Sequence, residues 1–409
     1  MPARLILDLS RLVFTGWRRT PAGIPRVELA YAEHFIANYS ERLNFVVLDA
    51  FGRLSILENR MAIAFVKEIA AYWRGDVAST RAYLRVALRA LSIHAVLLLQ
   101  YHGSLRHLVA RVAGPCIYVI LSQLHMERTK AIKRLKSAGN LRLVYFVHDI
   151  IPVLFPEYCP AKEEVQARRR LQGAAQFADV IVVNSQDTAR IFRETFGKHL
   201  PPNSIVVAPL GVNVSRLPEP QGNRSVESYF VMVGTIEPRK NHLMILNLWR
   251  KLGAELGSET PRLIVIGARG WENENVIDML ERSPALRHIV EERSRVSDEE
   301  MARLLRDARA LLMPSFAEGY GLPLAETLAL GVPALCSDIP ALREVGGDVP
   351  EFIDPIDGLS WRGAILDYAA HISPRRDAQL KRLESWKPTS WETHFGKVSD
   401  VLDAPKTGP

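Results

Sequence analysis

Apolar runs of strand length alternate with helical stretches along most of the chain. The runs are mostly β-branched or apolar without interruption, which is typical of strands covered on both faces, as in parallel sheets. The predicted strands are 4–10, 44–50, 116–122, 143–149, 180–185, 204–210, 229–234, 262–267, 309–315 and 332–338. Helical patterns lie between them, for example over residues 23–39 and 241–256. This order predicts an α/β fold of doubly wound sheets, with ligands at the carboxyl ends of the strands.

The chain is long enough for two domains. It has 409 residues, and one hydrophobic core rarely grows past about 250–300 residues. A polar stretch rich in Pro, Gly and Ser, residues 216–228, separates two βα series and is the predicted linker. The predicted domains are therefore 1–215 and 216–389, both Rossmann-like, with a C-terminal helix over 390–409 that packs back on the first.

Composition indicates a cytoplasmic protein. We find no run of about 20 apolar residues that would predict a transmembrane helix, and the N-terminus "MPARLILDLSRL" resembles a strand more than a signal peptide. The three cysteines are far apart in the sequence, which fits a reducing compartment and argues against a zinc site. No metal-ligand cluster or DxD motif is apparent, so no cofactor is expected.

Charge is unevenly distributed. Residues 1–215 carry 28 Lys and Arg against 16 Asp and Glu, a net +12, whereas the remainder carries 24 against 29, a net −5. The basic half is either a solvated face or a surface that meets an anionic partner. A membrane surface or a phosphorylated lipid fits better than nucleic acid, for which we find no motif. Residues 60–113 form a helical, arginine-bearing region that either lies on such a membrane or packs on its own domain.

The segment "EGYGLPLAE" (318–326) follows a predicted strand. Gly319 and Gly321 allow backbone amides to approach a ligand closely, and a helix is expected to start near residue 322, with Glu326 in its first turn or so. Glu318 and Glu326 would then accept hydrogen bonds from paired hydroxyls on either side of the free amides. The alternative is that Glu326 only complements the helix dipole.

A second loop, in "VMVGTIEPRKNH" (231–242), brings two cations to a strand end. Arg239 and Lys240 would clamp a diphosphate where the next helix starts, near residue 241. The alternative is an ordinary basic pair on the surface. Both loops follow strands that we expect in one parallel sheet, which favours a shared site.

These two loops carry a family resemblance. "EGYGLPLAE" matches the E-x7-E motif of retaining glycosyltransferases with the GT-B architecture, and "VGTIEPRKNH" resembles the phosphate-binding loop of glycosyltransferase family 4, in its mannosyltransferase-like branch. Further agreement is found in "FVHDIIPVLFPEY", "VIVVNSQDTARIF", "VAPLGVN" and "RVSDEEMARLLRDARALLMPSFAEGYG". The resemblance covers most of the chain and is weakest over 50–115 and 345–390.

The resemblance implies a role for each matching position. In the donor site, Glu318 would hold sugar hydroxyls, Glu326 the ribose diol, and Arg239 and Lys240 the diphosphate. His148 would face the donor sugar, with Asp149 orienting or assisting it. The remaining implied donor-site and loop residues are Gly234, Thr235, Val296, Gly319, Tyr320, Gly321 and, at the acceptor or phosphate loop, Gly23. Ser185 is equally well explained as a helix N-cap.

One position departs from the family pattern. Many members have Arg directly after the glycine that ends the first strand of the second domain, and this chain has Thr235 there. Arg239 would then supply the missing charge, or the diphosphate would rest mainly on Lys240.

The implied reaction is metal-independent, retaining transfer of a hexose. The implied donor is GDP-mannose or a related GDP-sugar, and the acceptor a lipid-linked glycan or polysaccharide such as an O-antigen chain, at the anionic inner membrane face. Two alternatives remain open from the sequence. One is a sugar-nucleotide epimerase or hydrolase of the same architecture, and the other is a non-catalytic subunit that binds a sugar nucleotide.

Overall fold

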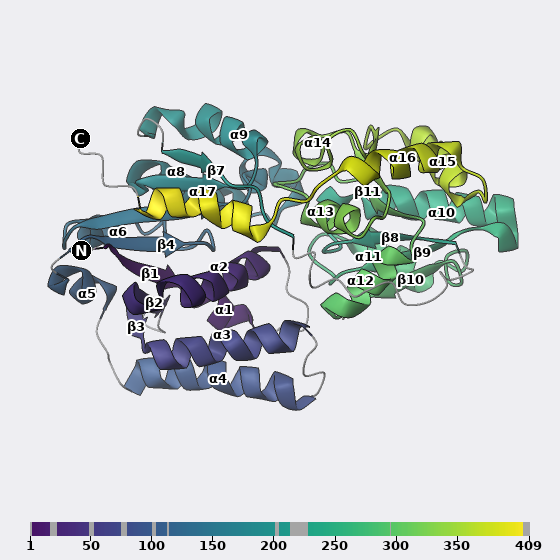
Figure 1. Ribbon diagram of the computed structural model, residues 1–409. Coiled ribbons are helices and arrows are strands. Elements are labelled where there is room, and N and C mark those ends of the chain that lie inside the picture. The colour runs from purple at the N-terminus through teal and green to yellow at the C-terminus, as the bar shows by residue number, and fades with distance from the viewer. Residues whose placement is uncertain are drawn as a thin grey trace.

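The computed structural model describes residues 2–16, 23–48, 53–74, 80–99, 104–112, 114–200, 204–212, 228–294 and 296–403. It consists of two lobes that lie side by side, each built on one sheet (Figure 1). The strands are β1 (Arg4–Asp8), β2 (Leu43–Leu48), β3 (Leu54–Leu57), β4 (Cys116–Ile120), β5 (Leu141–Val147), β6 (Val180–Val183), β7 (Ile205–Val207), β8 (Tyr229–Val233), β9 (Arg262–Ile266), β10 (Val290–Arg293), β11 (Ala310–Met313), β12 (Ala334–Ser337) and β13 (Glu351–Ile353).

Helices cover both sheets. In the first lobe these are α1 (Ser10–Thr15), α2 (Gly23–Tyr39), α3 (Asn59–Arg74), α4 (Thr80–Leu99), α5 (Leu105–Arg111), α6 (Thr129–Lys136), α7 (Ile151–Leu154), α8 (Glu163–Phe177) and α9 (Gln186–Phe196). The later helices are α10 (His242–Leu256), α11 (Glu274–Arg282), α12 (Asp298–Arg306), α13 (Leu322–Ala329), α14 (Pro340–Gly346), α15 (Gly358–Ala369), α16 (Pro374–Ser385) and α17 (Trp391–Asp403).

Each sheet has the strand order of a doubly wound fold. The first runs β3-β2-β1-β4-β5-β6-β7 and the second β10-β9-β8-β11-β12-β13. The pairings between these strands are parallel except that of β2 with β3. Every residue of β4, β6, β11 and β12 is buried, because helices cover both faces of the central strands. The predicted fold class is confirmed.

All ten predicted strands are present, and the described residues contain three further strands that were not predicted. These three, β3, β10 and β13, are all edge strands. Edge strands are short and only partly covered, so they lack the continuous apolar run that marks the central strands. β10, with the sequence VEER, is half-buried at every position.

The chain returns to the first lobe at its C-terminal end. Helix α17 lies along that lobe (Figure 1), where Nε2 of His394 bonds the Tyr31 hydroxyl at 2.8 Å and Arg42 pairs with Asp403 at 2.7 Å. The predicted linker, residues 216–228, lies outside the described residues except for Ser228, so the domain boundaries stay a prediction.

The arginine-bearing region 60–113 is helical where it is described. Helices α3 and α4 pack side by side, and α4 forms the outermost layer of the first lobe (Figure 1). Within the described ranges, we find no helix whose length and apolar character would let it cross a bilayer.

Candidate active site

Arg239, Lys240 and Glu318 form a buried charge cluster where β8 and β11 end. Nζ of Lys240 lies 2.5 Å from Oε1 of Glu318, and Nη1 of Arg239 lies 2.9 Å from Oε2 of the same carboxylate. Nε of Arg239 also lies 2.5 Å from Oε1 of Glu237. The two loops predicted to share a site are therefore in direct contact.

Local backbone geometry holds the two cations in place. Gly234 directly follows β8 and has φ +144°, and a β-carbon there would lie 3.2 Å from Cε of Lys240. A 3₁₀ turn over Pro238–Lys240 then leads into α10, which begins at His242. The amide of Phe316 donates to the Arg239 carbonyl at 2.8 Å. The cations thus lie on a short turn that is bonded to the loop carrying Glu318.

The cluster stays ionised despite its burial. Burial would raise the pKa of the Glu318 carboxyl, but Lys240 and Arg239 outweigh it and lower that pKa to about 2. Burial lowers the pKa of Lys240, an effect opposed by Glu318. Burial also disfavours the Arg239 guanidinium, but Glu318 and Glu237 raise its pKa overall. A ligand that carries an oxyanion would find two charged donors whose positions are already set.

The backbone of Gly319 approaches the first lobe closely. A β-carbon at this position would lie 2.3 Å from the His148 carbonyl oxygen and 2.8 Å from Cβ of Asp149. The hydroxyl of Ser185 donates to the Gly319 carbonyl at 2.9 Å, and that of Thr188 does so at 3.3 Å. Ser185 also caps α9 by accepting from the Thr188 amide at 3.0 Å. Its side chain therefore serves both as the predicted N-cap and as a contact between lobes.

Tyr320 and Gly321 complete the glycine loop. The Tyr320 hydroxyl donates to the Leu210 carbonyl at 2.9 Å, so its buried side chain anchors the loop to the first lobe. Gly321 has φ +104° and precedes the first residue of α13. This left-handed conformation strongly favours glycine.

His148 is buried and neutral. Its Nε2 donates to the Leu121 carbonyl at 2.7 Å, and its ring stacks on Phe146 at 4.4 Å between centroids. Burial lowers its pKa to about 3. Asp149 accepts from the Ile151 amide at 3.1 Å, and burial raises its pKa while Arg239 opposes that rise. Of the four residues predicted to be catalytic, His148 and Asp149 thus lie next to Gly319 and near Arg239, and Glu318 and Lys240 belong to the charge cluster itself.

Glu326 departs from the prediction in one respect. It is the fifth residue of α13, which begins at Leu322, so it lies in the second helical turn and does not complement free first-turn amides. Its Oε1 instead accepts from Nη1 of Arg26 at 2.8 Å. Arg26 also pairs with Asp298. This ion-pair triad connects α2 of the first lobe to α12 and α13 of the second.

Sequence reasoning missed Arg26. The signal available was a positive charge in the first turn of a predicted helix, where the helix dipole disfavours cations. Burial disfavours the Arg26 charge, but Glu326 and Asp298 raise its pKa overall. Burial raises the pKa of Glu326, and Arg26 opposes that rise.

The remaining predicted residues lie around this region. Gly23 is the exposed first residue of α2, three positions before Arg26. Val296 is 5% exposed and lies two positions before Asp298. The methyl group of Thr235 packs close to Gly270, where a β-carbon would lie 2.7 Å from it.

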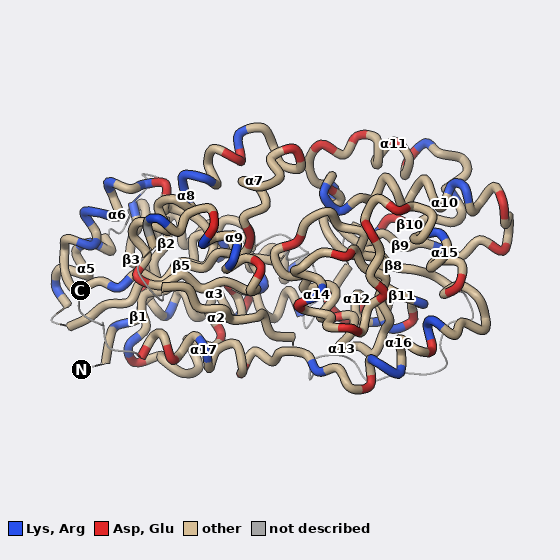
Figure 2. The backbone as a smooth tube through the Cα atoms, turned by 90° about the horizontal axis from the view of Figure 1, so that it is seen from above, with Lys and Arg blue, Asp and Glu red and all other residues tan. Residues whose placement is uncertain are grey.

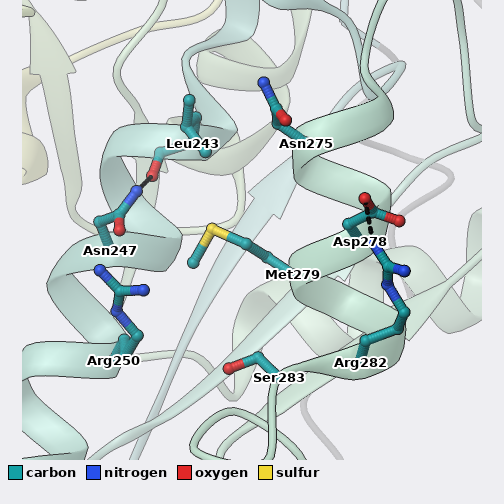
Figure 3. A pocket seen from close by; sticks show the side chains of 8 residues that line it. All are labelled: Leu243, Asn247, Arg250, Asn275, Asp278, Met279, Arg282 and Ser283. Atoms are coloured by element: carbon teal, nitrogen blue, oxygen red, sulfur yellow. Dashed lines mark hydrogen bonds and ion pairs between the residues drawn. The ribbon is translucent and has the colours of Figure 1, made fainter.

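A solvent-open hollow lies elsewhere on the second lobe. It has a volume of about 510 Å³ and is open to solvent between α10 and α11 (Figure 3). Its charged side chains include Asp278 and Arg282, which pair with each other. None of the predicted site residues lines this hollow.

Two facing doubly wound lobes are the GT-B architecture of glycosyltransferases. The crystal structure of Anabaena HepE in complex with UDP has the same fold, with a TM-score of 0.61 at 13% identity, covering 98% of this chain and 99% of that one. The description "Glycosyltransferase Family 4" matches residues 41–216, and "Glycosyl transferases group 1" matches residues 214–349. The chain belongs to glycosyltransferase family 4 and is a retaining enzyme of that family.

The curated relatives include mannosyltransferases. O-antigen chain mannosyltransferase B of Escherichia coli is 30% identical over 263 residues, which are 61% of this chain and 67% of the relative. Serotype-specific mannosyltransferase WbdA of Escherichia coli is 27% identical over 242 residues, which are 55% of this chain and 29% of that protein. The chain thus spans about two thirds of the first relative and less than a third of the second.

Proposed function

We propose that the enzyme transfers mannose from GDP-mannose to a lipid-linked or polysaccharide acceptor during synthesis of a cell-surface polysaccharide. The names of the two curated relatives support the sugar and the acceptor class. The enzyme would act in the cytoplasm at the inner membrane face, where a lipid-linked acceptor is exposed. We also propose that the boundary between the two domains lies between residues 215 and 216.

The contact of Arg239 and Lys240 with Glu318 carries the proposal. The two cations neutralise this carboxylate at 2.9 and 2.5 Å. A donor diphosphate would bring its own negative charge to the cations and leave the Glu318 oxygens able to accept from sugar hydroxyls. Hydrogen bonds of that kind contribute about 1.5–3 kcal/mol each. The amides of Gly319, Tyr320 and Gly321 would assist, and Val296, Gly234 and Thr235 would border the nucleotide.

These positions support the following chemistry. The bond between the anomeric carbon and the diphosphate breaks, and a bond to the acceptor oxygen forms on the same face of the sugar. A diphosphate oxygen takes the acceptor proton, while Arg239 and Lys240 stabilise the leaving group without a metal ion. His148, neutral because of its burial, would contact the sugar, and Asp149 would position it. Closure of the lobes at Gly319 would exclude water.

A donor screen followed by product analysis tests the proposal. GDP-mannose is expected to raise the melting temperature more than UDP-glucose or ADP-glucose, and the product with a lipid-linked mannan acceptor should carry a new α-mannose. A Lys240→Met variant should lose both effects, whereas Lys251→Met, on the outer surface of α10, should keep them. Stabilisation by UDP-sugars alone would overturn the donor assignment. Full-speed donor turnover without acceptor would instead favour a hydrolase or epimerase.

A further inference from the structure

Helix α4 exposes a row of leucines to solvent. Leu84, Leu88, Leu91 and Leu98 are 48, 62, 63 and 49% exposed. Their spacing of three, four and seven places them on one side of the helix. We call this side, with the exposed residues Arg81 and Arg85, the α4 face.

These leucines do not contribute to the hydrophobic core of the first lobe. The opposite side of α4 is already buried through Val86, Ala90, Ile93 and Leu97, and it packs on α3. The helix is therefore apolar on two sides, and only one of them contributes to the core. Figure 1 shows α4 at the outer edge of the first lobe with no further layer over it. A contiguous apolar surface of this kind marks an interaction site.

The charge around the α4 face favours an anionic partner. Helix α4 contains Arg81, Arg85 and Arg89 but no Asp or Glu. The neighbouring α3 carries a single acid, Glu68, which is paired with Arg89 at 2.6 Å. Residues of both helices thus leave an excess of positive charge beside the α4 face. Lys and Arg are also frequent along α6 and α8 (Figure 2), but these two helices pack in a different core cluster from α4 and do not border this face.

We propose that the α4 face binds an anionic lipid membrane, with its leucines inserted among the acyl chains and its arginines at the headgroups. An amphipathic helix binds in the interface plane by this combination of apolar burial and attraction to anionic lipids. A second copy of the chain fits less well, because its arginines would lie against leucines without an acid to pair with. This inference goes beyond the transfer reaction and does not depend on which sugar is transferred.

Vesicle flotation of the full chain tests the proposal. With phosphatidylcholine vesicles that contain about one third phosphatidylglycerol, the protein should float, and with pure phosphatidylcholine it should stay at the bottom. Raising the salt concentration should weaken binding, because the headgroup attraction is screened. The double variant Leu88→Gln/Leu91→Gln should bind at least about tenfold more weakly, since it removes two inserted side chains. Arg81→Glu/Arg85→Glu should lose selectivity for the anionic lipid.

A matched control distinguishes binding through the α4 face from non-specific hydrophobic adsorption to vesicles. Leu359 and Ile372 of the second lobe are each 79% exposed, so Leu359→Gln/Ile372→Gln removes more exposed apolar surface elsewhere. This control should float like the wild-type protein. Equal flotation of the α4 leucine variant and the wild type, with both folded by circular dichroism, would overturn the proposal. It would also be overturned if the wild type failed to float and light scattering gave a dimer that the leucine variant converts to a monomer.

Discussion

At the scale of single residues, the charge on Lys240 is a feature that contacts within this site hold in place. Its ammonium is buried, yet it is held 2.5 Å from Glu318 and packed against the bare backbone of Gly234. A buried ion pair stabilises a fold only weakly, so its position points to a role with ligand.

Replacing Lys240 with Met keeps the length of the side chain and removes its charge. We expect kcat/KM for sugar transfer to fall by about 10²–10³, the usual loss when one charge-stabilising donor is removed from an active site. Arg239 remains to pair with Glu318, so the melting temperature should change by only a few degrees. Steady-state kinetics with the wild type and Lys251→Met as references measure the effect. A loss below about threefold would contradict it.

A substitution at Gly319 tests whether the close approach of the two lobes is needed for catalysis. In Gly319→Ala the new methyl group would collide with the His148 carbonyl, 2.3 Å away, and force the two lobes apart. A displacement of about 1 Å can cost about 10²-fold in rate, and we expect a fall of that order in kcat/KM. Gly363→Ala is the control, because a β-carbon there meets nothing within 4 Å. Similar kinetics for the two variants would show that this close approach is not needed.

At the scale of elements, α2 and α13 are linked by the Arg26–Glu326 pair, and this link competes with the ribose contact proposed for Glu326. Donor binding would have to break or share the bond of 2.8 Å. Both side chains are about one quarter exposed, so we take the pair to contribute no more than about 1 kcal/mol.

Releasing this pair should make Glu326 more available. Arg26→Gln is expected to tighten GDP binding roughly fivefold, which corresponds to about 1 kcal/mol. Isothermal titration calorimetry of GDP with the wild type and the variant gives the ratio. Glu344→Gln is a useful reference, because Glu344 accepts from the amides of Gln186 and Asp187 in another contact between the lobes. Weaker binding by Arg26→Gln would show that Arg26 itself assists the nucleotide.

The sequence predicted the central elements and the local loops well, for physical reasons. Buried strands such as β4 carry an uninterrupted apolar run, and the loops at 237–240 and 318–321 combine charge with glycine or proline. The edge strand β10 and the partner of Glu326 were missed. β10 is only half covered, and the partnership with Arg26 joins residues 300 positions apart, which no local pattern contains.

At the scale of the whole molecule, buried histidines connect stability to pH. His394 of α17 is fully buried, bonds the Tyr31 hydroxyl at 2.8 Å, and bonds the Pro209 carbonyl at 2.9 Å. Burial lowers its pKa from 6.5 to about 4, although the contacts with the Pro209 and Ala208 carbonyls oppose the change. Burial likewise lowers the pKa of His148 and of His242 to about 3.

The fold should therefore lose stability as the medium becomes acidic. The unfolded chain takes up a proton at His394 near pH 6.5, whereas the folded chain takes it up only near pH 4. The contribution of this residue to the free energy of unfolding is complete above pH 6.5, falls by about 1.4 kcal/mol per pH unit below it, and stops falling near pH 4.

The variant His394→Gln tests this expectation, because it removes one titrating group and retains a donor and an acceptor. Urea unfolding at pH 7, 6 and 5 should give a shallower pH dependence for the variant by about that slope, while His371→Gln, with its exposed side chain, should match the wild type. Parallel curves for wild type and His394→Gln would mean that His394 titrates alike in the folded and unfolded chain, and that α17 does not exclude water from this residue as the structure implies.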